Sequence, residues 1–284
     1  MSEIQIGKIN KLKVVKEVPF GLYLEGGNYG EILLPKKYIP EDSKIGDLID
    51  VIVYFDSKDC IIATTEKPYA YVGDFAYLQV KSVTSIGAFL DWGLVKDLFV
   101  PFREQKERLQ KDKYYPFYIY FDIKSNRIAA TTRLLKFLSN DPSNYKLNEA
   151  VDLFIFREHE IGFQAVINNS HEGLLYKNEI FQPLKLGQYL KGFIKKIRDD
   201  GKIDLCLEKP GYEKVDGLAK TILQKIEEQG GSLNITDKSS SDIIHSVFHI
   251  SKKSYKKAIG SLYKQRLITI DSNCIKLTKK ARHK

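Results

Sequence analysis

The stretch YFDSKDCIIATT from Tyr54 to Thr65 recurs, with one insertion, as YFDIKSNRIAATT from Tyr120 to Thr132. An upstream landmark keeps the same spacing, because VPFGLYL from Val18 matches TSIGAFL from Thr84. The offset from Val18 to Thr84 equals the offset from Tyr54 to Tyr120. Independent landmarks at one constant offset indicate that the chain contains tandem copies of a single structural unit.

A third and fainter copy follows the first two. Gly21, Gly87 and Gly162 hold equivalent places in FGLY, IGAF and IGFQ. The offset from Gly46 to Gly187 equals the whole span from Gly21 to Gly162, so a second landmark agrees with the first. Each unit reads as about five short strands separated by turn signals in about 65 residues. Closing such a unit into a barrel removes its exposed strand edges. The sequence therefore predicts a mostly β protein with three tandem five-stranded barrels, of the OB-fold type or of the competing SH3-like type.

The last quarter of the chain has a different hydrophobic period. After Pro210 the apolar residues recur with a period of 3.6 instead of two, and residues 216–229 form a predicted amphipathic helix. A short strand, two more helices and a β-hairpin complete the order of a winged helix-turn-helix domain. The predicted domains are three barrels and one winged helix, with the boundaries 1–66, 67–138, 139–210 and 211–284.

The predicted third helix of this domain has two distinct faces. Its apolar residues from Tyr255 to Leu262 fall within one sector of about 100°, and lysines fall near the opposite direction. Lysine favours phosphate contact over base readout, so we expect weak sequence discrimination. The alternative is a dimerisation module whose lysines only face water. Lys253, Lys257 and Lys264 lie near that opposite direction, and Lys256 lies beside them.

Charge is concentrated in the same quarter. The formal net charge of the chain is +9. Residues 1–211 carry 30 Lys and Arg against 29 Asp and Glu, whereas residues 212–284 carry 15 against 7. A compact module with this excess attracts a polyanion, and counterion release drives the binding. A lysine-rich surface that is merely solvated is the alternative.

One unit also carries a family motif. The stretch VGDFAYLQVKSVTSIGAFLDWG at residues 72–93 resembles the opening of an S1 RNA-binding domain, which is an OB-fold. The second strand of that family reads aromatic-Gly-Ala-Phe-Val, and IGAFL from Ile86 matches it. FGLY from Phe20 keeps both aromatic positions in the first unit. The family's third-strand histidine aligns with Leu33, Phe99 and Tyr176.

The order of the modules extends this resemblance to the full chain. Three S1-like units followed by a basic C-terminal domain resemble the bacterial conserved virulence factor B family of S1-domain RNA-binding proteins. The resemblance implies single-stranded RNA as the partner. It also implies a role in post-transcriptional control of gene expression, including that of virulence genes.

Candidate binding residues follow from the OB-fold, in which ligands lie across the second and third strands. Aromatic rings there could stack on bases, although about half of the aromatic side chains in a small barrel point inward. We expect the third unit and the winged helix to form the main RNA surface. The candidate stacking residues are Phe20 and Tyr23, Phe89 and Phe99, and Phe163 and Tyr176, one pair in each unit. The candidate phosphate-contacting residues of the third unit are Lys177, Lys195, Lys196 and Arg198.

The sequence contains no recognisable catalytic motif. Neither a phosphate-binding GxxxxGK[ST] loop, a GxSxG elbow nor an HExxH metal motif occurs. We therefore expect a protein that is not an enzyme and needs no cofactor or metal. The sequence contains no apolar run of about 18 residues, so it does not predict a membrane span. Three cysteines without a CxxC pair and a start without a signal peptide favour a cytoplasmic location.

Three functions are compatible with these features. The first is a non-catalytic RNA-binding protein that holds unpaired RNA by charge and base stacking, with several weak modules acting together. The second is a DNA-binding transcriptional regulator in which the winged helix reads duplex DNA. The third is an adaptor that associates with the ribosome or with RNA-processing nucleases through its S1-like units.

Overall fold

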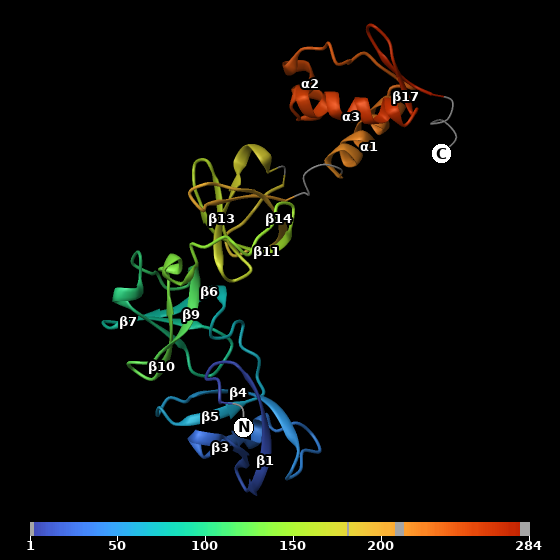
Figure 1. Ribbon diagram of the computed structural model, residues 1–284. Helices are drawn as coiled ribbons and strands as arrows, with labels where there is room; N and C mark the ends of the chain where they lie inside the picture. The colour runs from blue at the N-terminus through green and yellow to red at the C-terminus, as the bar shows by residue number, and fades with distance from the viewer. Residues whose placement is uncertain (1–2, 181, 208–212, 279–284) are drawn as a thin grey trace. The chain divides into compact units, whose positions relative to one another are not determined.

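Three closed five-stranded barrels and a C-terminal domain of helices and a small sheet form the computed structural model (Figure 1). The structure describes residues 3–180, 182–207 and 213–278. When the strands of each barrel are numbered along the chain, their order around the barrel is 1-2-3-5-4. The third and fifth strands run parallel. This Greek-key order is that of the OB-fold. It confirms the predicted fold class and decides against the SH3-like alternative.

The strands of each barrel are short and closely follow the repeat. The first barrel contains β1 (Ile9–Val18), β2 (Gly21–Glu25), β3 (Glu31–Pro35), β4 (Leu48–Phe55) and β5 (Ile61–Thr64). The second contains β6 (Phe75–Val83), β7 (Gly87–Asp91), β8 (Leu98–Pro101), β9 (Tyr114–Asp122) and β10 (Arg127–Thr131). The third contains β11 (Ala150–Glu158), β12 (Gly162–Ile167), β13 (His171–Tyr176), β14 (Tyr189–Ile197) and β15 (Ile203–Cys206).

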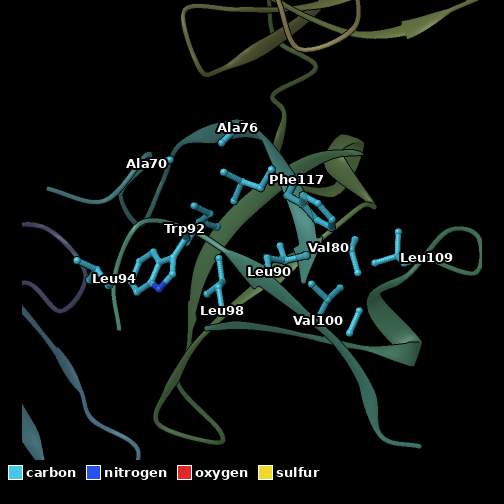
Figure 2. Packing of buried hydrophobic residues seen from close by; sticks show 14 of the residues in the cluster. Ala70, Ala76, Val80, Leu90, Trp92, Leu94, Leu98, Val100, Leu109 and Phe117 are labelled. Atoms are coloured by element: carbon cyan, nitrogen blue, oxygen red, sulfur yellow. The ribbon is translucent and has the colours of Figure 1, made fainter. Parts of the chain in front are cut away.

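Alternation along these strands builds the barrel interiors, because successive side chains of a strand point to opposite faces. In the second barrel Leu90 and Val100 are fully buried, and Figure 2 shows them gathered with Phe117 inside the barrel. Trp92 is also buried, and its indole Nε1 donates a hydrogen bond to the Lys96 carbonyl oxygen at 2.6 Å. The strand residues that alternate with these buried residues face outward.

The glycine that opens the second strand of every barrel permits a close approach of two strands. Gly21, Gly87 and Gly162 pair with the last residue of the third strand. A Cβ at each position would overlap a carbonyl oxygen of that strand, namely those of Leu34, Val100 and Leu175. The glycine of the repeat motif is therefore required by backbone packing.

Gly21→Ala is expected to lower the free energy of unfolding by about 1–3 kcal/mol, since the added methyl group forces the strands apart. Gly260→Ala is the matched control, because Gly260 lies inside a helix with nothing within 4 Å of the added Cβ. That change is expected to stabilise by about 0.5–1 kcal/mol through helix propensity. Scanning calorimetry measures both, and a Gly21→Ala protein as stable as the unchanged chain would contradict the packing argument.

The C-terminal domain has the predicted winged-helix order. Its first helix covers residues 213–228 and so begins slightly before the predicted 216–229. Ser240 and Ser251 cap the next two helices, where their hydroxyl oxygens accept bonds from Ile243 N and Ser254 N. The elements are α1 (Glu213–Glu228), β16 (Ser232–Leu233), α2 (Ser241–Phe248), α3 (Lys252–Lys264), β17 (Ile268–Ile270) and β18 (Ile275–Leu277).

The apolar face of α3 is the predicted one. Tyr255, Ala258, Ile259 and Leu262 are its buried residues. Tyr255 is fully buried, and its hydroxyl donates a hydrogen bond to the Ile235 carbonyl oxygen at 2.8 Å. Burial raises the pKa of this hydroxyl, so the side chain stays neutral and hydrogen-bonded. This anchor fixes the rotation of α3 and thereby the direction in which its lysines point.

Two of the three predicted domain boundaries lie within the described residues. Those after residues 66 and 138 stay predictions, and they fall between the last strand of one barrel and the first strand of the next. The boundary between residues 210 and 211 lies outside the described residues.

Candidate nucleic-acid interface

A cross-strand row of three residues occupies the same place on the outer face of each barrel. It is formed by the middle of the second strand, its partner on the third strand, and the residue beside that partner on the fifth strand. The strand registers define all three rows, because directly paired residues point to the same face of a sheet. The rows are Tyr23, Leu33 and Ile62 in the first barrel, Phe89, Phe99 and Ala129 in the second, and Gln164, Leu174 and Asp204 in the third.

The first row has an aromatic residue at its edge. Tyr23 is half-buried, and the ring of Phe20, which is 57% exposed, lies edge-on to it with centroids 6.5 Å apart. Lys16 Nζ lies 5.7 Å from the centre of the Tyr23 ring. The structure thus brings the predicted pair Phe20 and Tyr23 together beside a cation, in an arrangement suited to a flat and negatively charged ligand.

The second row combines rings with positive charge. Phe89 and Phe99 are half-buried neighbours with centroids 5.2 Å apart. They line a groove of about 390 Å³ that is also lined by Lys96, Arg103 and Arg127. The sequence indicated both rings as candidates, but none of the three cations was predicted. Their positions in the repeat could have identified them, because Lys96 precedes the third strand and Arg127 follows the polar turn before the fifth strand.

A carboxylate from the first barrel neutralises part of this groove. Asp59 Oδ1 lies 3.0 Å from Lys96 Nζ, and Asp59 Oδ2 pairs with Arg127. The Lys96 hydrogen bond, followed by the Arg127 contact, lowers the pKa of Asp59. Asp59 adopts a left-handed φ of 57° in the turn between β4 and β5, a conformation that asparagine and glycine adopt more readily. Its carboxylate contacts both cations and reduces the positive charge of the groove.

The register of the third barrel corrects the alignment made from sequence. Gln164 pairs with Leu174, so Leu174 and not Tyr176 is equivalent to Leu33 and Phe99. Phe163 is equivalent to an inward-facing residue, and only 8% of it is exposed. A one-residue shift reverses the face to which a strand residue points. The third row therefore has an amide and a carboxylate where the second has two rings.

The cations predicted in the third barrel are partly engaged within the protein. Arg198 donates to Asp204 Oδ1 from Nε at 3.0 Å and from Nη2 at 2.6 Å, and it also contacts the Tyr176 hydroxyl. Lys177 Nζ lies 2.8 Å from Glu158 Oε1. Lys195 and Lys196 are both exposed near the end of β14. Arg198 and Tyr176 are thus held in an internal network, which reduces their availability to a phosphate.

The predicted lysines of α3 all lie on its solvent side. All four are exposed; Lys253, Lys257 and Lys264 lie opposite the buried face of the helix, and Lys256 lies beside them. Within the described ranges, none of these four lysines forms an ion pair with another residue. The helix offers a line of ammonium groups suited to a charged backbone.

Neither a metal-binding cluster nor a membrane-spanning helix is found in the part of the chain that the structure describes. Among those residues, no group of three or more His, Cys, Asp or Glu side chains is arranged to hold a metal ion. In the same ranges, no helix combines the length and apolar character needed to cross a membrane.

These features define a class of protein that links tandem S1-type barrels to a winged helix. Residues 6–66 match the model of the S1 domain family, and residues 220–277 match that of the CvfB-like winged helix domain. S1 and winged-helix domains in one chain indicate a nucleic-acid-binding protein.

Full-length relatives narrow this class. A protein of Staphylococcus epidermidis named Conserved virulence factor B is 26% identical, over 97% of this chain and 95% of the relative. A protein of Staphylococcus aureus with the same name is 25% identical over the same shares. The chain is therefore similar along nearly its whole length to conserved virulence factor B proteins, which confirms the resemblance seen in its sequence.

One solved structure also covers nearly the whole chain. It is that of a Streptococcus pneumoniae multidomain protein with nucleic acid binding domains, which is 23% identical with a TM-score of 0.41. The match covers 96% of this chain and 98% of that one.

Proposed function

We propose that the protein is a non-catalytic, cytoplasmic RNA-binding protein that holds single-stranded RNA on its barrel rows and on α3. The observation that carries the proposal is the Phe89 and Phe99 pair in a groove lined by Lys96, Arg103 and Arg127. These half-buried rings can stack only on bases that are not paired and stacked in a helix, and a single strand offers such bases whereas a duplex does not. The cations supply sequence-independent attraction to the backbone.

The biological role follows from the relatives. Proteins named Conserved virulence factor B match almost the whole chain. We propose that this protein, too, acts in post-transcriptional regulation of gene expression, including that of virulence-related genes, through the RNA that it binds.

A competition titration tests the proposal. A labelled 20-nucleotide single-stranded RNA is bound to the full chain at fixed salt, and unlabelled single-stranded RNA or duplex DNA is added. We expect single-stranded RNA to compete at least about tenfold better, a difference of about 1.4 kcal/mol. Duplex DNA competing tenfold better would contradict the proposal.

The second candidate function is that of a DNA-binding transcriptional regulator. The exposed lysines of α3 favour it, because the third helix of a winged helix is the element that enters a DNA groove. The same titration distinguishes the two, and repeating it with residues on α3 replaced shows which ligand depends on that helix. Association with the ribosome or with RNA-processing machinery is tested by co-purification after nuclease treatment.

Asp59→Asn is expected to tighten binding of a single-stranded RNA about two- to fivefold at low salt, because a surface carboxylate no longer competes for Lys96 and Arg127. Fluorescence anisotropy at two salt concentrations measures the change. Asp152→Asn is the matched control, since Asp152 is an exposed carboxylate that pairs with Lys191 in the third barrel. Equal gains in both variants would show that net charge alone is responsible.

A further inference from the structure

The third barrel contains a pocket of about 720 Å³ on the face that carries its cross-strand row. Gln164, Leu174 and Asp204 of the row line it, and so does Glu172 of β13. This volume is in the range of pockets that hold a small ligand or a nucleotide. The lining residues include no Phe, Tyr or Trp, whereas the groove of the second barrel is lined by the neighbouring rings of Phe89 and Phe99. Discrimination between bases in this pocket would therefore come from its hydrogen-bonding groups.

The amide of Gln164 is already bonded at both ends. Its Nε2 donates to Glu172 Oε1, and its Oε1 lies 2.8 Å from His159 Nε2. These contacts fix the amide and orient the Glu172 carboxylate from one side. Burial raises the pKa of Glu172, which reflects the loss of water around the carboxylate. A desolvated carboxylate is stabilised by any N–H donor that enters the pocket.

The charges of the lining disfavour a phosphate. Its cations are each paired, because Arg198 bonds Asp204 and Lys202 Nζ lies 2.8 Å from Asp200 Oδ2. Glu160 and Glu172 add two further carboxylates to the lining. Like charges repel a phosphate group, whereas carboxylate oxygens accept hydrogen bonds from a ligand that offers N–H groups. The edge of a nucleobase is such a ligand, and the sugar-phosphate backbone is not.

We propose that this pocket binds a guanine base of an unpaired strand, with the Glu172 carboxylate accepting hydrogen bonds from the Watson–Crick edge. This inference rests on the proposed function and adds base discrimination to it. Guanine carries two adjacent donors on that edge, N1–H and the 2-amino group, which match the two oxygens of a carboxylate. Adenine and cytosine offer one amino group each, and uracil offers one N–H. In this proposal the rings of the second barrel stack on any base, whereas the pocket of the third barrel selects guanine.

The test uses RNA strands that differ only in their central base. The full chain is titrated by fluorescence anisotropy with 12-nucleotide oligouridines that carry one central guanosine, inosine or adenosine. Inosine lacks only the 2-amino group of guanosine. We expect the guanosine strand to bind about tenfold more tightly than the inosine strand, because inosine keeps N1–H and loses one of the two hydrogen bonds to the carboxylate. Glu172→Gln is expected to remove this difference, because the amide replaces one acceptor with a donor.

Two variants serve as controls for this experiment. Glu160→Gln removes another carboxylate of the same pocket, which is exposed and lies at the turn before β12, and should keep the preference. Phe89→Leu changes the second barrel. It should weaken the binding of all three RNA strands equally, because stacking depends little on the identity of the base. The thermal midpoint of each variant shows that it is folded.

Each outcome separates this inference from the function on which it rests. Equal binding of the guanosine and inosine strands, tighter binding of adenosine, or a preference that survives in Glu172→Gln would overturn the pocket assignment while RNA binding stands. Failure of all three strands to bind would overturn the proposed function itself. Guanosine monophosphate is added as a competitor, and binding as tight as that of the strand would show that the pocket serves a free nucleotide instead.

Discussion

Replacing Phe89 and Phe99 together with alanine is expected to weaken binding of single-stranded RNA by about 10- to 100-fold. Stacking of a base on an aromatic side chain contributes about 1–3 kcal/mol, and each 1.4 kcal/mol is a factor of ten in affinity. The two rings are neighbours on adjacent strands with centroids 5.2 Å apart, so a base or two successive bases can lie on them. The loss is expected to be the same for strands of different sequence.

The measurement is a titration of the full chain with a labelled 12-nucleotide RNA at fixed salt. Tyr114→Ala is the matched control, because it removes a ring that is 52% exposed from β9 of the same barrel, outside the cross-strand row. Both variants are checked by their thermal midpoints. An affinity that falls no further in the double variant than in the control would remove the second barrel from the interface.

Replacing Lys253, Lys257 and Lys264 with alanine is expected to flatten the dependence of RNA affinity on salt. Each lysine that neutralises a phosphate of a single strand contributes about 0.7 to the slope of log affinity against log salt, so three contribute about 2. All three are exposed on the side of α3 opposite Tyr255, Ala258, Ile259 and Leu262. Affinity at low salt falls accordingly, and little difference remains at high salt.

Lys225→Ala is the control for this series. Lys225 lies on α1 of the same domain, and its ammonium group pairs with Glu228 at 3.4 Å. The slope of this variant should equal that of the unchanged chain. A triple variant whose slope is also unchanged would assign the α3 lysines to solvent, as in a dimerisation module, and would leave binding to the barrels.

The sequence by itself determined the number and kind of the domains. Constant offsets between landmarks identified repeated units, and a change of hydrophobic period marked the winged helix, because periodicity reflects which face of a strand or helix is buried. It also placed Phe89 and Phe99 on the second and third strands, where the structure has them. The apolar face of α3 followed from angular spacing alone, because one helical turn is the same in any context.

Only the tertiary structure decided which side chains meet. A strand residue changes face with a one-residue shift in register, so Phe163 and Gln164 exchange roles once β12 is paired with β13. Arg198 is followed directly by two aspartates, yet it is Asp204 on the next strand that holds its guanidinium group. Asp59 reaches Lys96 and Arg127, which are 37 and 68 residues away. Such contacts depend on the exact register of paired strands and on which side chains of distant segments meet, and local sequence patterns do not specify either.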